Sequence, residues 1–345
     1  MKFCARFFFA TTSLLAITAV LVACGGGSQK LPPASALAYV AHPQSHSISV
    51  INIPANQTIN TIQVGNTSTG LTASYPQTVA VTPDRTRAYV PDGHASVWVI
   101  DTKTNLVTTT IPVPYNEGLT LSPDGTRAYV GAIYGVAVID TTSNSLITTI
   151  PVTGAPNQSY ADNVAVSPDN RRIFVTNLAG NNIWVIDAAT NTIVDNIVTR
   201  NTGNNQITVA PDGNHAYAAG FFNGNNSGSF VDVIDLKTNT VSSSFSVGQS
   251  LPTQITVTPD GNRIFVVDDG GHFDAFDAAT NMPLISIQIS TDLAAMAFTP
   301  NDSHVYLTGG TAGNVVYVLD ANTYAVVSTI NVHDFSAGLT IVPAS

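Results

Sequence analysis

The sequence predicts an all-β protein, because its composition and its order both favour strands and turns over helices. Of its 22 acidic residues only Glu117 is a glutamate, and Asp favours turns where Glu favours helices. The 345 residues include 25 Gly and 19 Pro, and short runs rich in Val, Ile and Thr lie between these turn residues. The same pattern returns every 40 to 48 residues, which indicates several copies of one strand-rich unit.

Residues 1–23 are expected to form an export signal, with a flexible tether over residues 24–35. Lys2 and Arg6 precede an apolar stretch that ends in Leu21-Val22-Ala23-Cys24, an order typical of a signal peptide. This ending resembles the cleavage box of bacterial lipoproteins. The resemblance implies cleavage before Cys24, lipidation of its sulfur and a membrane anchor through that lipid. The alternative is an ordinary secretory signal in which the Cys is incidental.

The residue after Cys24 is Gly25 and not Asp. By resemblance to the sorting of bacterial lipoproteins, this implies a location in the cell envelope at the outer membrane. Cleavage also removes Cys4, so we expect no disulfide and no thiolate metal site in the folded part.

The charge pattern excludes two classes of function. The net charge is −10 and no run of Lys or Arg occurs, so nucleic acid is not an expected partner. Beyond the signal, no apolar run is long enough to span a bilayer, which excludes a multi-span membrane protein.

Three anchors define the repeat, and each occurs seven times. A proline recurs at Pro83, Pro123, Pro168, Pro211, Pro259, Pro300 and Pro343, usually in Pro-Asp-Gly or a close variant. An aromatic residue recurs at Tyr39, Tyr89, Tyr129, Phe174, Tyr217, Phe265 and Tyr306. A third anchor recurs at Asn52, Asp101, Asp140, Asp187, Asp235, Asp277 and Asp320. Seven copies of one unit are therefore expected.

Each unit contains four alternating runs separated by turns. In the fourth unit these runs are Ile207–Ala210, His215–Ala218, Ser229–Ile234 and Val241–Val247. A single four-stranded sheet cannot bury both faces, whereas seven arranged radially can, so we predict a seven-bladed β-propeller over residues 36–345. The first unit lacks an innermost strand and the last unit supplies only that strand, so the C-terminus is expected to pair with the N-terminal strands.

The repeat resembles the YVTN family of β-propeller repeats. The motif stands as Phe174-Val175-Thr176-Asn177 and, in a changed form, as Tyr89-Val90-Pro91-Asp92. The resemblance covers residues 36–345. It implies the propeller fold and no particular activity, because such folds serve many functions.

The two faces of the predicted ring differ. The Pro-Asp-Gly and Asp-x-x-Thr-Asn turns are short and lie on one face, where eleven anchor Asp residues are expected to serve turn structure alone. The opposite face, which we call the variable face, carries long loops over residues 65–77 and 220–228. Variable loops on a rigid scaffold are a usual place for a binding site.

Histidines and carboxylates on the variable face are candidate metal ligands. The candidates are His42, His94, Asp268, Asp269, His272 and His333. Imidazole and carboxylate suit zinc, copper or non-haem iron, and the blades that carry these residues are neighbours on a closed ring. The alternative is that small polar loops collect Asp and His by composition.

A second candidate site lies where each innermost strand begins, six residues before the proline anchor. The positions are Gln77, Glu117, Asp162, Asn205, Thr253, Ala294 and Ala337, with Asn163, Gln206 and Gln254 one step further. We expect them to crowd the mouth of the central channel. Oxygen ligands suit calcium, and a carboxylate pair suits acid–base hydrolysis. The alternative is a polar, water-filled channel without chemistry.

Phe221 and Phe222 are two adjacent aromatic residues in a long Asn- and Gly-rich loop. They are interpreted either as a partner-binding tip or as a lid over the edge of the blade.

We therefore expect a monomeric binding module rather than an enzyme, with no cofactor. Its variable face would bind an envelope protein, a glycan or a small ligand. The alternative is a metal-assisted, lactonase-like hydrolase with a divalent ion, calcium or zinc, at Glu117 and Asp162.

Overall fold

The computed structural model describes residues 36–65, 75–133, 135–152, 160–201, 203–222, 228–309 and 314–343. These residues form 28 strands in seven four-stranded antiparallel sheets. The predicted all-β class and the seven-bladed propeller are confirmed. The expected signal and tether lie outside the described residues, and among the described residues no helix is long and apolar enough to cross a membrane.

Each blade is built from four strands that follow one another from the centre of the ring to its outside. Blade 1 contains β28 (Leu339–Pro343), β1 (Ala36–His42), β2 (Ser47–Asn52) and β3 (Gln57–Gln63). Blade 2 contains β4 (Ala80–Val81), β5 (Arg87–Pro91), β6 (Ser96–Asp101) and β7 (Leu106–Pro112). Blade 3 contains β8 (Asn116–Leu121), β9 (Arg127–Ala132), β10 (Gly135–Asp140) and β11 (Ser145–Pro151). Blade 4 contains β12 (Ala161–Val166), β13 (Arg172–Asn177), β14 (Asn182–Asp187) and β15 (Thr192–Val198).

The remaining three blades follow the same order. Blade 5 contains β16 (Gly203–Val209), β17 (His215–Phe222), β18 (Gly228–Asp235) and β19 (Thr240–Gly248). Blade 6 contains β20 (Pro252–Val257), β21 (Arg263–Asp268), β22 (His272–Asp277) and β23 (Pro283–Gln288). Blade 7 contains β24 (Leu293–Phe298), β25 (His304–Gly309), β26 (Val315–Asp320) and β27 (Val326–Asn331).

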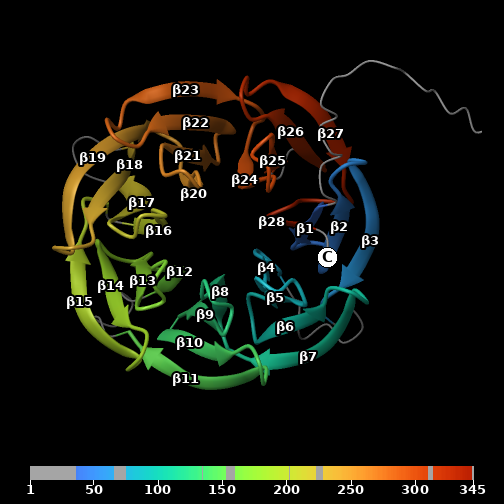
Figure 1. Ribbon diagram of the computed structural model, residues 1–345, viewed down its shortest axis with the longest axis horizontal. Coiled ribbons are helices and arrows are strands. Elements are labelled where there is room, and N and C mark those ends of the chain that lie inside the picture. The colour runs from blue at the N-terminus through green and yellow to red at the C-terminus, as the bar shows by residue number, and fades with distance from the viewer. Residues whose placement is uncertain are drawn as a thin grey trace, which may run out of the picture. The chain divides into compact units, whose positions relative to one another are not determined.

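The seven innermost strands surround a common centre and the outermost strands form the wall (Figure 1). Innermost strands of neighbouring blades touch in an unbroken series, β28 to β4, β8, β12, β16, β20, β24 and back to β28. Apolar clusters fill the spaces between adjacent blades, as where Tyr39 and Val50 of blade 1 pack with Val90 and Ile100 of blade 2. The core is therefore a ring of interfaces between blades.

The predicted closure of the ring is confirmed in blade 1. β28 pairs antiparallel with β1, from Leu339 opposite Val40 to Pro343 opposite Ala36. Backbone bonds continue the ladder beyond the strand, because Ala41 N–H donates to the Gly338 carbonyl oxygen at 2.9 Å. The last described strand thus covers an edge that would otherwise be open.

The eleven anchor Asp residues serve turn structure, as predicted. In the first turn, Asp84 Oδ1 accepts hydrogen bonds from Thr82 Oγ1 at 2.5 Å and from Thr86 N–H at 3.0 Å. At the end of the third strand, Asp101 Oδ1 accepts from Thr104 N–H at 2.7 Å. These donors favour the carboxylate form and hold the pKa of both Asp residues below the usual value. The other nine make equivalent bonds, namely Asp124, Asp140, Asp169, Asp187, Asp212, Asp235, Asp260, Asp277 and Asp320.

Aromatic anchors and nearby Arg residues link several blades to the next one on the face of the tight turns. Tyr89 Oη of blade 2 donates to Asn144 Oδ1 of blade 3 at 2.6 Å and lies 3.2 Å from the Thr141 carbonyl oxygen. Arg87 Nη1 donates to the same carbonyl, and Arg127 of blade 3 repeats the contact on Ala188 of blade 4 at 2.5 Å. The aromatic residue and the Arg two positions before it therefore lock neighbouring blades together.

Replacing Tyr89 by Phe is expected to destabilise the fold by about 1–2 kcal/mol, because loss of the hydroxyl removes the donor to Asn144 Oδ1 of the next blade. For a domain of this size, that free energy corresponds to a fall in Tm of about 2–3 °C. Thermal unfolding followed by circular dichroism measures it. Tyr75→Phe is the control, since Tyr75 is 50% exposed; equal shifts for both variants would contradict the link between blades.

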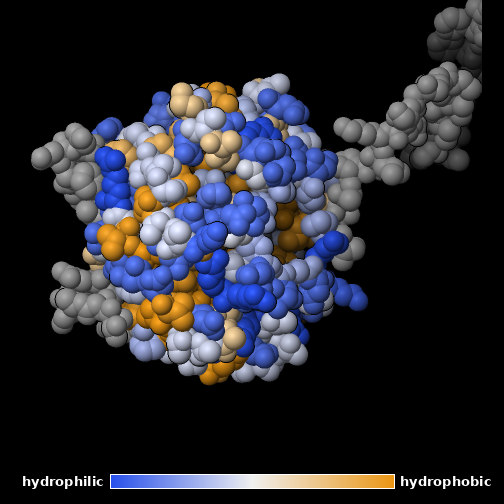
Figure 2. Space-filling view, turned by 60° about the vertical axis from the view of Figure 1, so that its left-hand side comes forward, coloured by the Kyte–Doolittle hydropathy of each residue, from blue (hydrophilic) through white to orange (hydrophobic). Residues whose placement is uncertain are grey.

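The outer wall exposes apolar side chains in separate places. Large examples on the outermost strands are Leu106 (64% exposed), Val194 (58%), Ile59 (56%) and Val327 (55%), which belong to four different blades. In the space-filling view, hydrophobic residues lie in patches separated by hydrophilic ones (Figure 2). Scattered exposed apolar residues are normal for a soluble surface.

Candidate functional site

One cavity of about 520 Å³ opens where the innermost strands begin. All ten positions that the sequence predicts at the channel mouth line it: Gln77, Glu117, Asp162, Asn163, Asn205, Gln206, Thr253, Gln254, Ala294 and Ala337. They come from all seven blades, because Ala337 lies two residues before the start of β28 of blade 1. The structure thus brings this predicted set together at a single site, which we call the channel-mouth cavity.

β-Bulges at the start of the innermost strands aim these side chains. The pairing of β8 with β9 shifts between Asn116 and Leu119, which leaves Glu117 outside the ladder. The pairing of β12 with β13 shifts in the same way between Ala161 and Val164, around Asp162. Blades 5, 6 and 7 repeat the shift around Asn205, Thr253 and Ala294. A bulge frees a residue from its ladder and turns it out of the sheet, so the repeat itself builds the ring of side chains.

Close backbone packing fixes the position of Asp162. A Cβ atom built on Gly131 would lie 2.4 Å from the Asp162 carbonyl oxygen and 2.8 Å from that of Ala161. A Cβ atom on Gly118 would lie 2.6 Å from the same Asp162 oxygen. Blade 3 therefore needs glycine at both positions to let β12 of blade 4 approach. The two acidic residues of the cavity are held by the backbones of these adjacent blades.

Among the residues that the structure describes, the two carboxyl groups of Glu117 and Asp162 have no compensating partner. Within the described residues, neither accepts a hydrogen bond or joins an ion pair, and no Lys, Arg or His lines the cavity. Burial, with the nearby Glu117 charge, raises the pKa of Asp162 to about 7. Burial also raises the pKa of Glu117. Near neutral pH, Asp162 is therefore present both with and without its proton.

Replacing Asp162 by Asn is expected to stabilise the protein at pH 8. The folded pKa of about 7 lies above the ordinary value of 3.8, so the folded state keeps a proton that the unfolded state loses, and stability falls as pH rises toward 7. Asn removes this loss, and we expect a gain of about 2 kcal/mol at pH 8 after allowing for solvent in the open cavity.

Urea unfolding at pH 8 and pH 4.5 tests this expectation, because the gain should fall to about half or less at the lower pH. Asp302→Asn is the matched control, since Asp302 is exposed in the tight turn of blade 7. Loss of its charge should leave the free energy of unfolding unchanged at both pH values. A gain of equal size at both pH values would show that the Asp162 charge is not its cause.

Amide side chains connect the blades around the cavity. Asn163 Nδ2 donates to Gln206 Oε1 at 3.3 Å, from blade 4 to blade 5. Gln254 Oε1 of blade 6 accepts from Met296 N–H of blade 7 at 2.5 Å. Asn205 Nδ2 donates to the Pro252 carbonyl oxygen at 2.5 Å, whereas its Oδ1 has no hydrogen-bond partner among the described residues. The amides therefore stabilise the ring and leave one buried acceptor unused.

The cavity also has an apolar rim that the repeat pattern does not predict. Tyr160 (37% exposed), Leu178 (47%) and Leu251 (39%) line it together with Ile133 and Phe335. Each lies in a loop, shortly before an innermost strand or after a second strand. No periodic pattern in the sequence marks such positions, but their place beside the variable loops could have indicated them as lining residues. A site with a polar floor and an apolar rim is typical of small-ligand binding.

The histidine candidates do not form one site. Among the described residues, no three His, Cys, Asp or Glu side chains are grouped closely enough to hold a metal ion. His94 is exposed and lies edge-on to Tyr115, with ring centroids 6.4 Å apart. His333 Nε2 lies 3.3 Å from Thr61 Oγ1 on the outermost strand of blade 1. The expected shared metal site is therefore not assembled.

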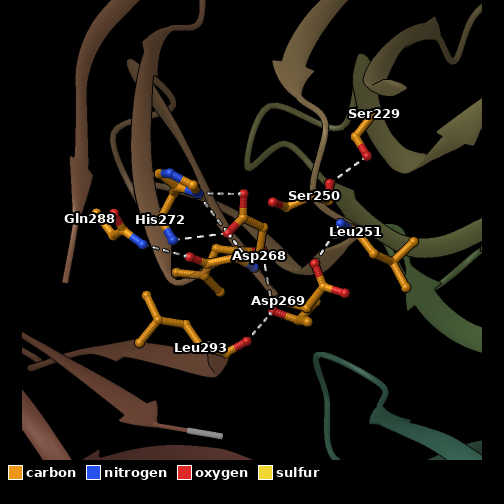
Figure 3. Close-up of polar contacts among 11 residues, drawn as sticks. Ser229, Ser250, Leu251, Asp268, Asp269, His272, Gln288 and Leu293 are labelled. Carbon is orange, nitrogen blue, oxygen red and sulfur yellow. Dashed lines mark hydrogen bonds and ion pairs between the residues drawn. The ribbon is translucent and has the colours of Figure 1, made fainter. Parts of the chain in front are cut away.

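His272 and Asp268 form a local pair in blade 6. His272 Nδ1 lies 3.1 Å from both carboxylate oxygens of Asp268 (Figure 3). Asp268 Oδ1 also accepts from the backbone N–H of His272 at 2.8 Å, and Asp269 turns away to accept from Leu251 N–H at 2.8 Å. Ser250 lies on the side of Asp268 in the same view, so these residues do not line up as a Ser-His-Asp triad.

His42 is fully buried in β1. Its Nε2 lies 2.9 Å from Ser49 Oγ, and its Nδ1 lies 3.3 Å from the Phe335 carbonyl oxygen and 3.2 Å from Asp334 Oδ1. Burial lowers the pKa of His42, and the nearby Asp334 charge only partly opposes this shift. The imidazole is thus used in joining β1 to the segment that leads into β28.

The repeat explains why His42 and Asp268 belong to separate blades. Counting from the aromatic anchor, both stand at the fourth position of the motif, as do Asp92 and Asn177. Asp92 Oδ1 accepts from the N–H groups of the following loop, at 2.7 Å from Ala95, and Asn177 Oδ1 accepts from Ala179 N–H at 3.2 Å. The polar residue at this position binds the loop that follows it in blades 2, 4 and 6, whereas His42 binds Ser49 and the segment before β28. These side chains are therefore held in separate blades.

The structure corrects the expected loop at Phe221 and Phe222. Both residues end β17, where Phe221 pairs with Ser229 and Phe222 with Gly228 of β18. The hairpin continues through Gly220, which pairs with Phe230. The pair is therefore part of a long strand and not of a loop tip; residues 223–227 and the Phe222 side chain lie outside the described residues.

Comparison with solved structures finds the same fold. The chain is similar to a functionally unknown protein from Desulfotomaculum acetoxidans, with a TM-score of 0.74, 18% identity, and coverage of 90% of this chain and 99% of that chain. It is also similar to hydrazine synthase from Kuenenia stuttgartiensis, with a TM-score of 0.68, 18% identity, and coverage of 81% and 99%. At this identity the likeness shows the fold alone. No family model and no curated protein matches the chain.

Proposed function

We propose that the protein is a binding module of the bacterial cell envelope, anchored by lipid at Cys24, whose ligand site is the channel-mouth cavity. The observation that supports it is the convergence of side chains from all seven blades on one cavity of about 520 Å³, a size usual for small-ligand sites. The ligand classes in view are a small molecule, a glycan, or a segment of an envelope protein.

Blocking the cavity tests this proposal. Ala294→Trp places an indole among the lining residues, whereas Ala279→Trp adds the same group at an exposed position in a tight turn on the other face. A probe set of cellotriose, chitotriose, cyclohexylamine and an acetylated lysine amide is titrated while Tm is followed, because a ligand that binds the folded state raises Tm. One probe class should stabilise the wild type and Ala279→Trp but not Ala294→Trp. Equal stabilisation of both variants would place the site elsewhere.

The anchor has its own test. We propose that the chain is a YVTN-type lipoprotein because of the Leu21-Val22-Ala23-Cys24 order and the Phe174–Asn177 motif. Cys24→Ala should move the protein from the membrane fraction to the soluble fraction, whereas Cys4→Ala should leave it in the membrane fraction. If the Cys24 variant stays membrane-bound, the lipid anchor is wrong.

A lactonase-like hydrolase is the second candidate, and the Asp162–Glu117 pair favours it. With the pKa of Asp162 raised to about 7 by burial and the Glu117 charge, one carboxyl can donate a proton while the other accepts one. A divalent ion such as calcium would find these carboxylates and the free Asn205 Oδ1 as oxygen ligands. Hydrolysis of γ-butyrolactone, with calcium or with a chelator, should fall about 100-fold or more in Glu117→Gln. No hydrolysis in either condition would refute this candidate.

A further inference from the structure

We infer that the ligand of the channel-mouth cavity carries a protonated amine. The inference rests on the proposed function, since it names the chemical class that the same cavity selects. It follows from the charges, the hydrogen-bonding groups and the apolar rim of the cavity.

The charges of the lining residues have one sign. Glu117 and Asp162 are acidic, and none of the other lining residues is Lys, Arg or His. Two carboxyl groups without a counter-ion repel each other and repel an anionic ligand. A cation placed between them removes this cost, whereas a neutral ligand leaves it in place.

The two carboxylates of the cavity, those of Glu117 and Asp162, are acceptors that no hydrogen-bond donor satisfies among the described residues. In the next blade, Asn205 is 9% exposed; its Nδ2 is bound to Pro252 and its Oδ1 is unpartnered. Buried acceptors are normally satisfied, so this atom is a second, independent sign of a missing donor. An ammonium group has three N–H donors and no acceptor, which suits the two unpaired carboxylates of blades 3 and 4.

The rim favours an organic cation over a metal ion. Calcium takes six to eight oxygen ligands, and the described residues supply no group of three acidic or histidine ligands. Tyr160, Leu178 and Leu251 instead offer apolar surface beside the carboxylates. An amine on a hydrocarbon or ring body contacts both parts of the cavity. The amine belongs either to a small molecule or to a lysine side chain of a partner.

Matched pairs of probes test the inference on the full chain. Cyclohexylamine is compared with cyclohexanol, which keeps the ring and lacks the charge. Nα-acetyl-lysine methylamide, whose side-chain amine is charged, is compared with its Nε-acetylated form, which represents a lysine side chain without charge. Binding is measured by calorimetry and located by the backbone amide NMR shifts of Glu117, Asp162 and Asn205. The charged member of at least one pair should bind about tenfold or more tightly than its neutral counterpart, and the pair that does so identifies the source of the amine.

Proton release gives a second readout. Because the Asp162 pKa is raised to about 7 by burial and the Glu117 charge, amine binding should release more protons at pH 6 than at pH 8. The dependence of binding enthalpy on buffer ionisation measures this release. Asp162→Asn should weaken amine binding about tenfold or more and reduce the release. Asp302→Asn, with the same loss of charge at an exposed turn, should change neither.

The outcomes separate this inference from the proposed function. If cyclohexanol or a neutral trisaccharide binds as well as the amines and Ala294→Trp blocks it, the cavity is a binding site but the amine inference is wrong. The amine inference is also wrong if calcium, and not the amines, shifts the backbone amide NMR signals of Glu117, Asp162 and Asn205. If no probe binds, or if binding is unchanged in Ala294→Trp, the proposed function fails as well.

Discussion

Deletion of residues 336–345 is expected to destabilise the protein by about 5 kcal/mol or more, because it removes the strand that closes the ring. The deletion takes away the five-residue pairing of β28 with β1 and the buried Leu339 side chain. It also leaves the buried residues Ala38 and Val40 of β1 beside an open edge. For a domain of this size, the corresponding fall in Tm is about 8 °C or more.

Deletion of Ala344 and Ser345 alone is the matched control, because these residues follow β28 and lie outside the described residues. Calorimetry of both truncations measures the difference. A shortened chain without residues 336–345 that melts with the wild type would show that the ring is stable without this strand.

Replacing Gly131 by Ala is expected to cost about 3 kcal/mol, or about 5 °C in Tm. The new methyl group would meet the Asp162 and Ala161 carbonyl oxygens at 2.4 and 2.8 Å. Both are backbone atoms of a paired strand, so neither can turn aside as a flexible side chain does. Because blade 4 must shift, the variant should also lose ligand binding at the channel-mouth cavity.

Gly261→Asn is the control for this variant. Gly261 has a φ of 74° and no atom within 4 Å of an added Cβ. The equivalent tight turns already carry Asn170 at φ 60° and Asp302 at φ 52°, so Asn is tolerated there. We expect a change below about 1 kcal/mol. If Gly131→Ala is equally mild, the approach of the two blades is looser than described.

The sequence was sufficient for the fold because the fold is repetitive. Proline, aromatic and Asp anchors recur in register, and each has one local task, as Asp101 shows by binding Thr104 N–H. Such contacts span only a few residues, so they can be predicted from the local sequence. The ring closure was predictable too, since the incomplete first unit and the last strand fit together.

The candidate site was predictable as a ring but not as a chemical environment. Counting back from the proline anchor located Glu117, Asp162 and Asn205, because a repeat places equivalent positions around one centre. The bulges that turn these residues out of the ladder leave no regular mark in sequence, and neither does the rim. The prediction of a shared metal site was wrong for His42 and His272. It selected them by residue type, whereas each side chain is hydrogen-bonded within its own blade.

The pairing of Pro343 with Ala36 has one further consequence. The two ends of the described chain lie directly opposite each other across a single ladder, so a short linker can join them. A circularly permuted chain can then be reopened in any of the tight turns, which moves the non-covalent seam of the ring to another blade. Seven such permutants, one opened in each blade, would keep the residues of the cavity unchanged. Comparing their unfolding would show how much each blade contributes to cooperative folding.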